Sequence, residues 1–280
     1  MKKNVAYIIL VLVFFVGLGV MLYPTISDYV NSKVQSKAIV DYEATLSQMT
    51  EKDYTEIFQK ADEYNAALRS MDYPFMYYDR LDGYMDMLRV DSSGVMGYVC
   101  IDKIKVELPI YHGTSDTVLN SAAGHLEGSS LPVGGESTHC VISAHRGLPS
   151  AKLFTNLDKL EPGDTFTVTV LDRVLTYEVF QVLIVEPSEV SALYVMDGED
   201  LCTLVTCTPY GINTHRLLVQ GRRIETEAPK PVVYVPNDAF RIDPLIVAPA
   251  VAAPMLLVLL ISLFVQSGRK KDSDNNDDSD

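Results

Sequence analysis

The sequence predicts an all-β domain, either a closed barrel or a sandwich, that follows a helical segment and lies between two membrane-spanning helices. Long apolar runs stand near both ends of the chain. Residues 25–90 show apolar side chains at helical spacing, and residues 91–226 show short apolar stretches separated by turn residues. The three patterns are typical of membrane helices, amphipathic helices and strands, in that order.

The first apolar run extends from Val5 to Leu22 and is preceded by Lys2 and Lys3. It is long enough to cross a hydrocarbon core of about 30 Å, so we expect residues 1–24 to form an N-terminal transmembrane anchor. A cleaved signal peptide is the alternative reading. Because no small-residue cleavage site follows the run, we favour an uncleaved anchor.

The second apolar run, Leu245 to Val265, predicts a C-terminal transmembrane helix over residues 244–266, kinked by its two prolines. A Pro-rich linker, residues 227–243, precedes it, and the acidic tail at 267–280 is expected to be disordered. Each run has positive charge on the side nearer its chain end: Lys2 and Lys3 precede the first run, and residues 269–271 follow the second. We therefore expect both termini in the cytoplasm and the intervening domain outside the cell membrane.

Residues 25–90 form the predicted helical segment. From Tyr29 to about Leu88 the chain is rich in Ala, Glu, Lys, Gln and Met and has no glycine before Gly83. Pro74 interrupts this helical pattern. The helices would serve as a stalk or pack on the next domain. Their helical spacing is shown by Ile57, Ala61, Tyr64 and Leu68.

Residues 91–226 change to short strands, of which seven or eight are expected in about 130 residues. This number favours a closed barrel or a sandwich. Two of the strands flank Leu171-Asp172-Arg173 and predict a hairpin. The expected strands are 97–101, 106–111, 139–144, 165–170, 174–184, 201–207 and 216–222.

The net charge of −14 argues against nucleic acid as a partner, because phosphate binding needs a basic surface. The chain has four cysteines, and Cys100, Cys140 and Cys202 stand within apolar stretches. We interpret these three as buried thiols rather than as disulfides. The chain has no C-x-x-C pair, so we expect no structural zinc, and no metal or cofactor is predicted.

Cys207 and Arg216 are the strongest candidates for chemistry. Cys207 closes one apolar strand and Arg216 opens the next, with a Pro, Gly and Asn-containing loop between them. In a hairpin, the thiol and the guanidinium would face each other across the mouth of the loop. A thiol beside a fixed positive charge tends toward the nucleophilic thiolate.

A histidine is the usual partner of a nucleophilic cysteine, and the chain has five. His145 follows an apolar strand, as Cys207 does, so parallel neighbouring strands would bring both side chains to one rim. His125 lies in a loop-like stretch and is the second choice. His215 is adjacent to Arg216 and would point to the opposite face of its strand.

The motifs around these residues resemble those of the sortases, the cysteine transpeptidases of Gram-positive cell surfaces. SAHRG surrounds His145, TLVTC ends at Cys207 and THRLL surrounds Arg216. The wider text, including GHLEGSSLPVGG and SAHRGLPSAKLF, is similar to class C, the pilus-assembling branch. The resemblance implies an eight-stranded β-barrel. It also implies Cys207 as nucleophile, His145 as general acid and base, and Arg216 as the residue that steadies the oxyanion. Apart from the resemblance, His125 and Thr206 are candidate substrate-binding or supporting residues.

For function, the resemblance implies a thiol transpeptidase that needs no cofactor. Its substrate would be a pilin or other surface protein with a Leu-Pro-x-Thr-Gly-like sorting signal. The cysteine would attack the Thr–Gly carbonyl and hold the protein as a thioester. A lysine amine of another pilin would resolve the thioester.

Three other functions remain open on sequence alone. A sortase that attaches proteins to peptidoglycan would use a cell-wall amine as its acceptor, and a hydrolytic cysteine protease would use water. In an inactive membrane scaffold, Cys207 would be one more buried strand thiol and Arg216 a solvated charge.

A lid is the last expectation. Many class C sortases carry an Asp-Pro-aromatic motif that plugs the site, and the nearest match here is Asp72-Tyr73-Pro74-Phe75, with one residue inserted. As a variant lid, it would place Asp72 near Arg216 and Phe75 over Cys207. The alternative, which we favour, is a helix-breaking turn without a regulatory role.

Overall fold

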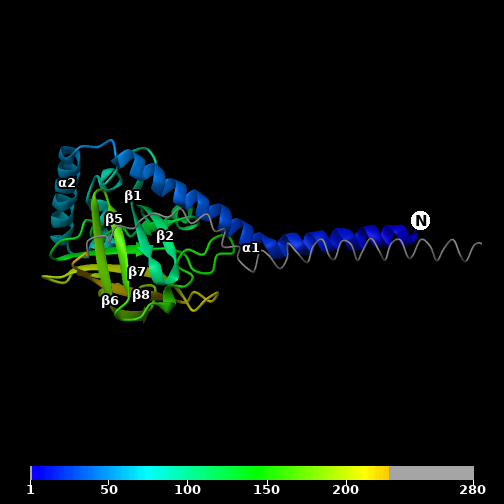
Figure 1. Cartoon of the computed structure of the whole chain (residues 1–280). Coiled ribbons are helices and arrows are strands. Elements are labelled where there is room, and N and C mark those ends of the chain that lie inside the picture. The colour runs from blue at the N-terminus through cyan, green and yellow to red at the C-terminus, as the bar shows by residue number, and fades with distance from the viewer. Residues whose placement is uncertain (1, 227–280) are drawn as a thin grey trace, which may run out of the picture. The chain divides into compact units, whose positions relative to one another are not determined.

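The computed structural model describes residues 2–226 (Figure 1). The predicted linker, second membrane helix and acidic tail lie outside the described residues. The chain divides into two compact units with a boundary between Ser27 and Asp28. The second unit holds the barrel and the helices packed on it.

Helix α1 is continuous from Lys2 to Leu46, with Pro24 inside it. The sequence predicted an anchor ending at residue 24 and a separate helix from Tyr29, but helix-favouring residues on both sides carry the helix through the proline. Within the described chain, the stretch from Ile9 is long and apolar enough to cross a membrane. Side chains such as Val16, 67% exposed, are free to contact lipid.

The part of α1 that belongs to the second unit packs on the barrel. Tyr42 is fully buried; its hydroxyl donates to the carbonyl of Met96 (3.1 Å) and accepts from the amide of Leu171 (2.9 Å). Burial raises the pKa of Tyr42, so the hydroxyl keeps its proton. Gln35 donates to the carbonyl of Ser121 (2.7 Å). This part of the helix is therefore docked on the barrel and does not act as a free stalk.

Helix α2, Glu51–Arg69, begins at a capping box formed by Thr50 and Asp53. Its buried face includes Ala61, Tyr64 and Leu68, as the helical spacing predicted, but Phe58 is buried where Ile57 was expected, and Ile57 is half-buried. Asn65 accepts the amide of Leu131 (2.7 Å) and fixes the helix against a loop of the barrel.

Pro74 opens the short helix α3, Pro74–Tyr77, a position where its missing amide costs nothing. The chain then continues through the single turns η1 (Tyr78–Arg80) and η2 (Tyr84–Asp86). The predicted helical segment is thus interrupted after Leu46 and again after Arg69.

Eight strands close into a barrel in the order β1-β2-β3-β4-β7-β8-β6-β5, so the closed barrel is confirmed (Figure 1). The β5–β6 hairpin is also confirmed, with Val170 opposite Arg173. The strands are β1 Val95–Ile101, β2 Val106–His112, β3 Ala123–His125, β4 Thr138–Ser143, β5 Thr165–Val170, β6 Arg173–Val185, β7 Asp200–Thr208 and β8 His215–Ile224. The remaining short turns are η3 Asp102–Ile104, α4 Asp116–Leu119, η4 Leu157–Lys159 and η5 Ser191–Leu193.

Strand β3 was the one the sequence did not predict. It has only three residues, Ala123–His125, and it pairs in parallel with β2 and antiparallel with β4. A parallel strand that short has no alternating pattern to detect, and the glycines and serines that follow it are typical of a loop.

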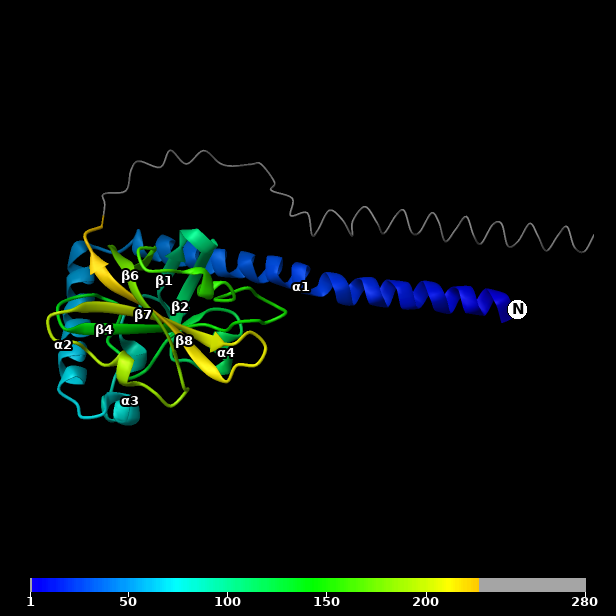
Figure 2. The same ribbon diagram turned by 90° about the horizontal axis from the view of Figure 1, so that it is seen from below.

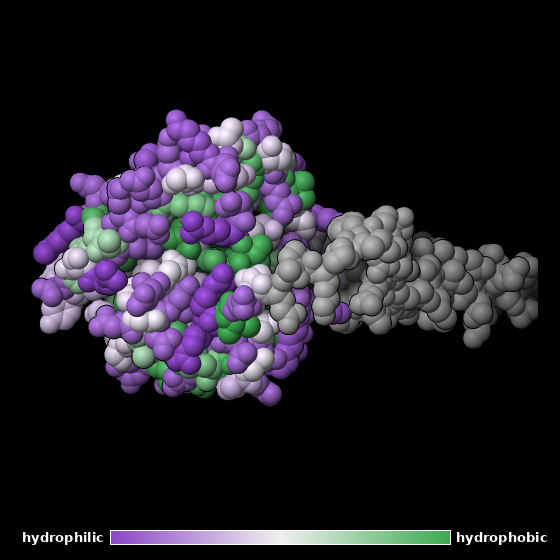
Figure 3. Space-filling model, turned by 60° about the vertical axis from the view of Figure 1, so that its left-hand side comes forward, coloured by the Kyte–Doolittle hydropathy of each residue, from purple (hydrophilic) through white to green (hydrophobic). Residues whose placement is uncertain are grey.

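Large side chains fill the barrel interior, and two of them pack directly on the backbone of a glycine in β8. The rings of Phe166 and Tyr177 stack with centroids 5.5 Å apart. A Cβ at position 221 would lie 2.6 Å from Phe166 Cε1, so Gly221 in β8 leaves the space that this pair needs. The outer surface seen in Figure 3 is mainly hydrophilic with scattered apolar patches, as expected for a solvated domain.

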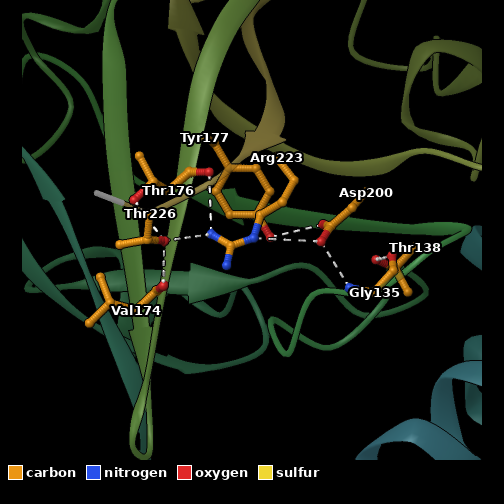
Figure 4. A network of polar contacts seen from close by, with 8 residues as sticks. All are labelled: Gly135, Thr138, Val174, Thr176, Tyr177, Asp200, Arg223 and Thr226. Carbon is orange, nitrogen blue, oxygen red and sulfur yellow. Dashed lines mark hydrogen bonds and ion pairs between the residues drawn. The ribbon is translucent and has the colours of Figure 1, made fainter. Parts of the chain in front are cut away.

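A polar network fixes the beginnings of β4 and β7 (Figure 4). Asp200 accepts the Tyr177 hydroxyl (3.1 Å) and the Gly135 amide (2.9 Å), and Arg223 lies 3.9 Å away. Thr138, the first residue of β4, donates to the carbonyl of Gly135 (2.6 Å). The two parallel strands therefore start in a fixed register, which also determines where they end.

Candidate active site

Cys207 and Arg216 are direct partners in the β7–β8 ladder. This is the hairpin that the sequence predicted, with the loop from Pro209 to Thr214 between the two strands. Tyr210 and Ile212 in that loop are exposed. The thiol-bearing and guanidinium-bearing residues therefore meet at the loop end of the hairpin.

His145 stands at the equivalent level, two residues beyond the end of the neighbouring strand β4. Strands β4 and β7 run parallel, with Ser143 paired to Val205, and lie side by side in Figure 2. The amide of Ala144 donates to the carbonyl of Val205 (3.1 Å), which extends the ladder beyond β4. His145 thus follows Ser143 by two residues, as Cys207 follows Val205. The expected parallel neighbours at one rim are confirmed.

The three candidate residues line one cavity on the outer face of the barrel. Because side chains alternate along a strand, Ser143, Val205 and Leu218 share this face with them, while Ile142 and Leu204 pack in the interior. The cavity has a volume of about 460 Å³. It is bordered by the β6–β7 loop on one side and by residues that follow β3 on the other; these borders include Pro187, Glu189, Val190, Leu193, Leu126 and Glu127.

Most of this cavity is apolar. Val141, Leu193, Val205 and Leu218 form a buried cluster on the outer face, separate from the barrel interior. Phe75 from α3 packs on the same cluster. The polar end is formed by His145, Cys207 and Arg216. The site therefore joins an apolar groove to a thiol, an imidazole and a fixed cation.

Phe75 lines the cavity at its apolar cluster, and among the described residues no ion pair joins Asp72 to Arg216. The Phe75 ring lies edge-on to Tyr194 of the β6–β7 loop, with centroids 5.4 Å apart. A Cβ at position 128 would lie 2.9 Å from Phe75 Cα, so Gly128 forms a close seat for this segment. Asp72 is exposed.

Arg216 makes its described contacts within its own hairpin. Its guanidinium donates to the carbonyls of His215 (3.2 Å) and Asn213 (3.4 Å). Among residues 2–226 it forms no ion pair. Its charge is therefore available to the cavity.

The two supporting candidates are placed differently. Thr206 lines the cavity, and its hydroxyl donates to the carbonyl of Ala144 (2.7 Å), which ties β7 to the residue before His145. His125 does not line the cavity. It belongs to β3 rather than to a loop, is fully buried, and bonds the Tyr84 hydroxyl (2.9 Å) and the carbonyl of Ser130 (2.8 Å). Its contacts are those of a packed core histidine.

All four cysteines fall within the described residues, and all are free thiols. Cys140 and Cys202 are buried side by side on β4 and β7. Burial raises the pKa of Cys202 well above its usual value and that of Cys100 to about 12. Of the four, Cys207 is the thiol that lines the cavity. In the part of the chain that the structure describes, no group of His, Cys, Asp and Glu side chains gathers into a metal site.

The family follows from comparison with known proteins. Residues 99–224 match the model of the sortase domain. Sortase C1 from Streptococcus agalactiae is 49% identical in sequence, superposes with a TM-score of 0.64, and aligns over 68% of this chain and 100% of its own. The chain belongs to the sortase family of cysteine transpeptidases.

Other sortases give the same picture. The structure of sortase C from Streptococcus pneumoniae, described as bearing on pilin substrate specificity, is 47% identical with a TM-score of 0.62, over 69% of this chain and 99% of its own. Sortase D of Bacillus subtilis is 30% identical over 137 residues, which are 48% of this chain and 66% of that protein. The match with sortase A of Streptococcus agalactiae covers 54% of that protein.

Two features of this sortase site had no clear signal in the sequence. Tyr194 and Gly128, which hold Phe75, lie in loops far from α3 in sequence, and only the closed barrel brings them together. The positive φ of Gly128 (87°) is the one local reason for a glycine there.

Proposed function

We propose that this sortase is a membrane-anchored transpeptidase that cleaves an LPxTG-like sorting signal between Thr and Gly and joins the released acyl group to a lysine amine of a pilin. One observation carries the proposal: Cys207, His145 and Arg216 line one cavity. Cys207 lies on β7, His145 follows its parallel neighbour β4, and Arg216 lies on its antiparallel neighbour β8.

In the first half-reaction, the Cys207 thiolate attacks the threonine carbonyl carbon. Arg216 stabilises the oxyanion of the tetrahedral intermediate, because its guanidinium stays charged and offers several donors. His145 gives a proton to the departing glycine nitrogen as the C–N bond breaks. The products are a thioester on Cys207 and a free N-terminal glycine on the released tail.

In the second half-reaction, the acceptor amine attacks the thioester carbonyl. His145 takes a proton from the attacking nitrogen, an amide forms, and Cys207 leaves as a thiolate. With a lysine side chain as acceptor, the product is an isopeptide bond. The apolar groove that includes Val141 and Leu218 suits the Leu-Pro part of the signal, and Phe75 would have to leave it first.

Pilin polymerisation is favoured over wall attachment by the similarity to sortase C structures, among them the pilus-related sortase C of Group B Streptococcus at 41% identity. Transfer to a peptidoglycan amine is the second candidate. It differs only in the acceptor amine, and the similarity to proteins named sortase A is the reason to test it.

We also propose that the first unit of the chain anchors the enzyme in the cell membrane with its N-terminus in the cytoplasm. The apolar stretch of α1 and the preceding Lys2 and Lys3 support this orientation. A C-terminal helix that crosses the membrane in the opposite direction, as the basic residues at 269–271 favour, would return the second terminus to the cytoplasm. The catalytic domain would then face the exterior, where pilins and wall amines are found.

The acceptor can be determined by competition. The full chain in detergent is mixed with a sorting-signal peptide and equal concentrations of a pilin domain and a peptidoglycan stem peptide. We expect a covalent pilin–peptide product, identified by mass at one lysine and absent when that lysine is replaced by arginine. A product formed only with the stem peptide would show wall attachment, and peptide hydrolysis alone would show a protease.

A further inference from the structure

The residues on either side of His145 and Cys207 are tied to each other. Between the residues that precede them in sequence, the Thr206 hydroxyl donates to the carbonyl of Ala144 (2.7 Å). Behind them, the Arg146 guanidinium donates to the Thr208 hydroxyl (3.4 Å). The two catalytic candidates are thus bracketed by cross-links between their sequence neighbours.

Arg146 makes more contacts than this one. Its side chain is 9% exposed, and Nη2 donates to Asp158 Oδ2 at 2.6 Å. Its guanidinium also lies 5.9 Å from the centre of the Tyr210 ring, in the loop that follows Cys207. One guanidinium therefore bridges the segment after His145, the segment after Cys207 and the turn at 157–159.

The backbone around Arg146 supports the same arrangement. A Cβ at Gly147, which has a φ of 77°, would lie 3.1 Å from the Tyr210 ring, so the two segments are in close contact. The amide of Gly147 donates to the Thr155 hydroxyl (3.1 Å), and the amide of Phe154 donates to the carbonyl of His145 (3.1 Å).

A side chain this buried carries a cost. Arg146 Nε is buried and has no hydrogen-bond partner among the described residues. Removing a cation from water without satisfying each donor is unfavourable, and an apolar residue in its place would avoid that cost. Stability alone therefore does not account for an arginine at this position.

The position of His145 relative to Cys207 offers a reason for an arginine at position 146. Within the described chain no hydrogen bond joins the two side chains, so their separation depends on how their backbone segments are held. A displacement of about 1 Å between reacting groups can cost about 100-fold in rate.

We propose that Arg146 is a positioning residue, which sets the geometry of His145 and Cys207 by holding Thr208, Tyr210 and Asp158 around one guanidinium. The inference rests on the proposed roles of His145 and Cys207. It predicts that loss of the Arg146 contacts lowers the reactivity of Cys207 without unfolding the domain.

The test uses alkylation of Cys207 by iodoacetamide in the full chain, which needs no sorting signal. Rates are measured from pH 5 to 9 by peptide mass. Cys140 and Cys202 are buried, and burial raises the pKa of Cys100 to about 12, so labelling is followed at Cys207 alone. The variants are Arg146→Gln, Arg146→Lys and Asp158→Asn, with His145→Ala as the reference for a lost partner.

Arg222→Gln is the matched control, because Arg222 also combines an ion pair (Glu199, 2.7 Å) with an aromatic contact (Phe180, 4.7 Å), at the other end of β8. Thermal unfolding of each variant separates reactivity from stability. Asp158→Asn removes the ion pair at a side chain that is 44% exposed, so this variant is expected to fold even if Arg146→Gln does not.

We expect Arg146→Gln to move the pH profile toward that of His145→Ala and to slow alkylation at pH 7 by about 10-fold or more. Arg146→Lys should not restore it, since an ammonium lacks the fork that reaches both Thr208 and Asp158. Asp158→Asn should have a smaller effect in the same direction, and Arg222→Gln none.

Two results would overturn the inference, and only the second would also contradict the proposed function. If Arg146→Gln and Asp158→Asn superimpose on wild type while His145→Ala does not, Arg146 has no positioning role and the proposed function stands. If wild type itself superimposes on His145→Ala, there is no pair to position, and the role of His145 in the proposed function fails as well.

Discussion

Cys207 and Arg216 are register partners beside the loop of the β7–β8 hairpin, and His145 stands on the other side of β7, two residues beyond the end of β4. The central strand of the site thus carries the proposed nucleophile Cys207, with the proposed base His145 just beyond β4 on one side and the Arg216 cation on β8 on the other. This order follows from the barrel topology, in which β4, β7 and β8 are consecutive.

Arg216→Lys should lower the acylation rate by about 100- to 1,000-fold, the usual effect of removing one oxyanion donor, while peptide affinity changes little. Lysine keeps the charge but lacks the planar fork. Single-turnover acylation with a sorting-signal peptide measures this. An unchanged rate with weakened peptide binding would instead assign Arg216 to substrate binding.

Phe75→Ala should increase access to the groove. The edge-on contact of Phe75 with Tyr194 contributes about 1 kcal/mol to the closed arrangement, so we expect roughly a fivefold rise in kcat/KM for a sorting-signal peptide. Tyr73→Ala is the control, because Tyr73 is exposed. Equal effects of the two variants would favour a plain turn at this segment over a lid.

Tyr42→Phe should destabilise the barrel by about 1–3 kcal/mol, because the Met96 carbonyl and the Leu171 amide would lose their buried partner. Tyr29→Phe, at an exposed tyrosine of the same helix, should have no effect. Chemical denaturation of the full chain in detergent measures both. A neutral Tyr42→Phe would mean that α1 is not docked as described.

Stability should fall in mild acid. Burial lowers the pKa of both His112 and His139, so between those folded-state values and about 6.5 the unfolded chain binds more protons. This stabilisation is complete above about pH 6.5 and is lost as pH falls through the folded-state pKa, at up to about 1.4 kcal/mol per pH unit for each histidine. His139→Gln should flatten the slope, and His215→Gln, at an exposed position, should not.

Much of the site could be predicted because its signals are local. The strand ends near Cys207, Arg216 and His145 follow from alternation and turn residues, and the sequence places each of them to within one residue without knowledge of the pairing. The hairpin pairing needs only the loop between the two strands.

The remaining features depend on contacts between distant segments. His125 resembled a loop residue because its strand is three residues long and held by β2 and β4. The path of α1 through Pro24 is set by helical neighbours on both sides, which outweigh one lost hydrogen bond. The contacts of Arg146 with Thr208 and Asp158 need the closed barrel before they exist.

The most direct test of the central claim is the intact mass of the full chain after incubation with an LPxTG-like peptide. We predict a single acyl adduct that lacks the residues after Thr, that maps to Cys207, and that is absent from Cys207→Ala. An adduct that persists in Cys207→Ala, or no adduct with either wild type or Phe75→Ala, would contradict the account.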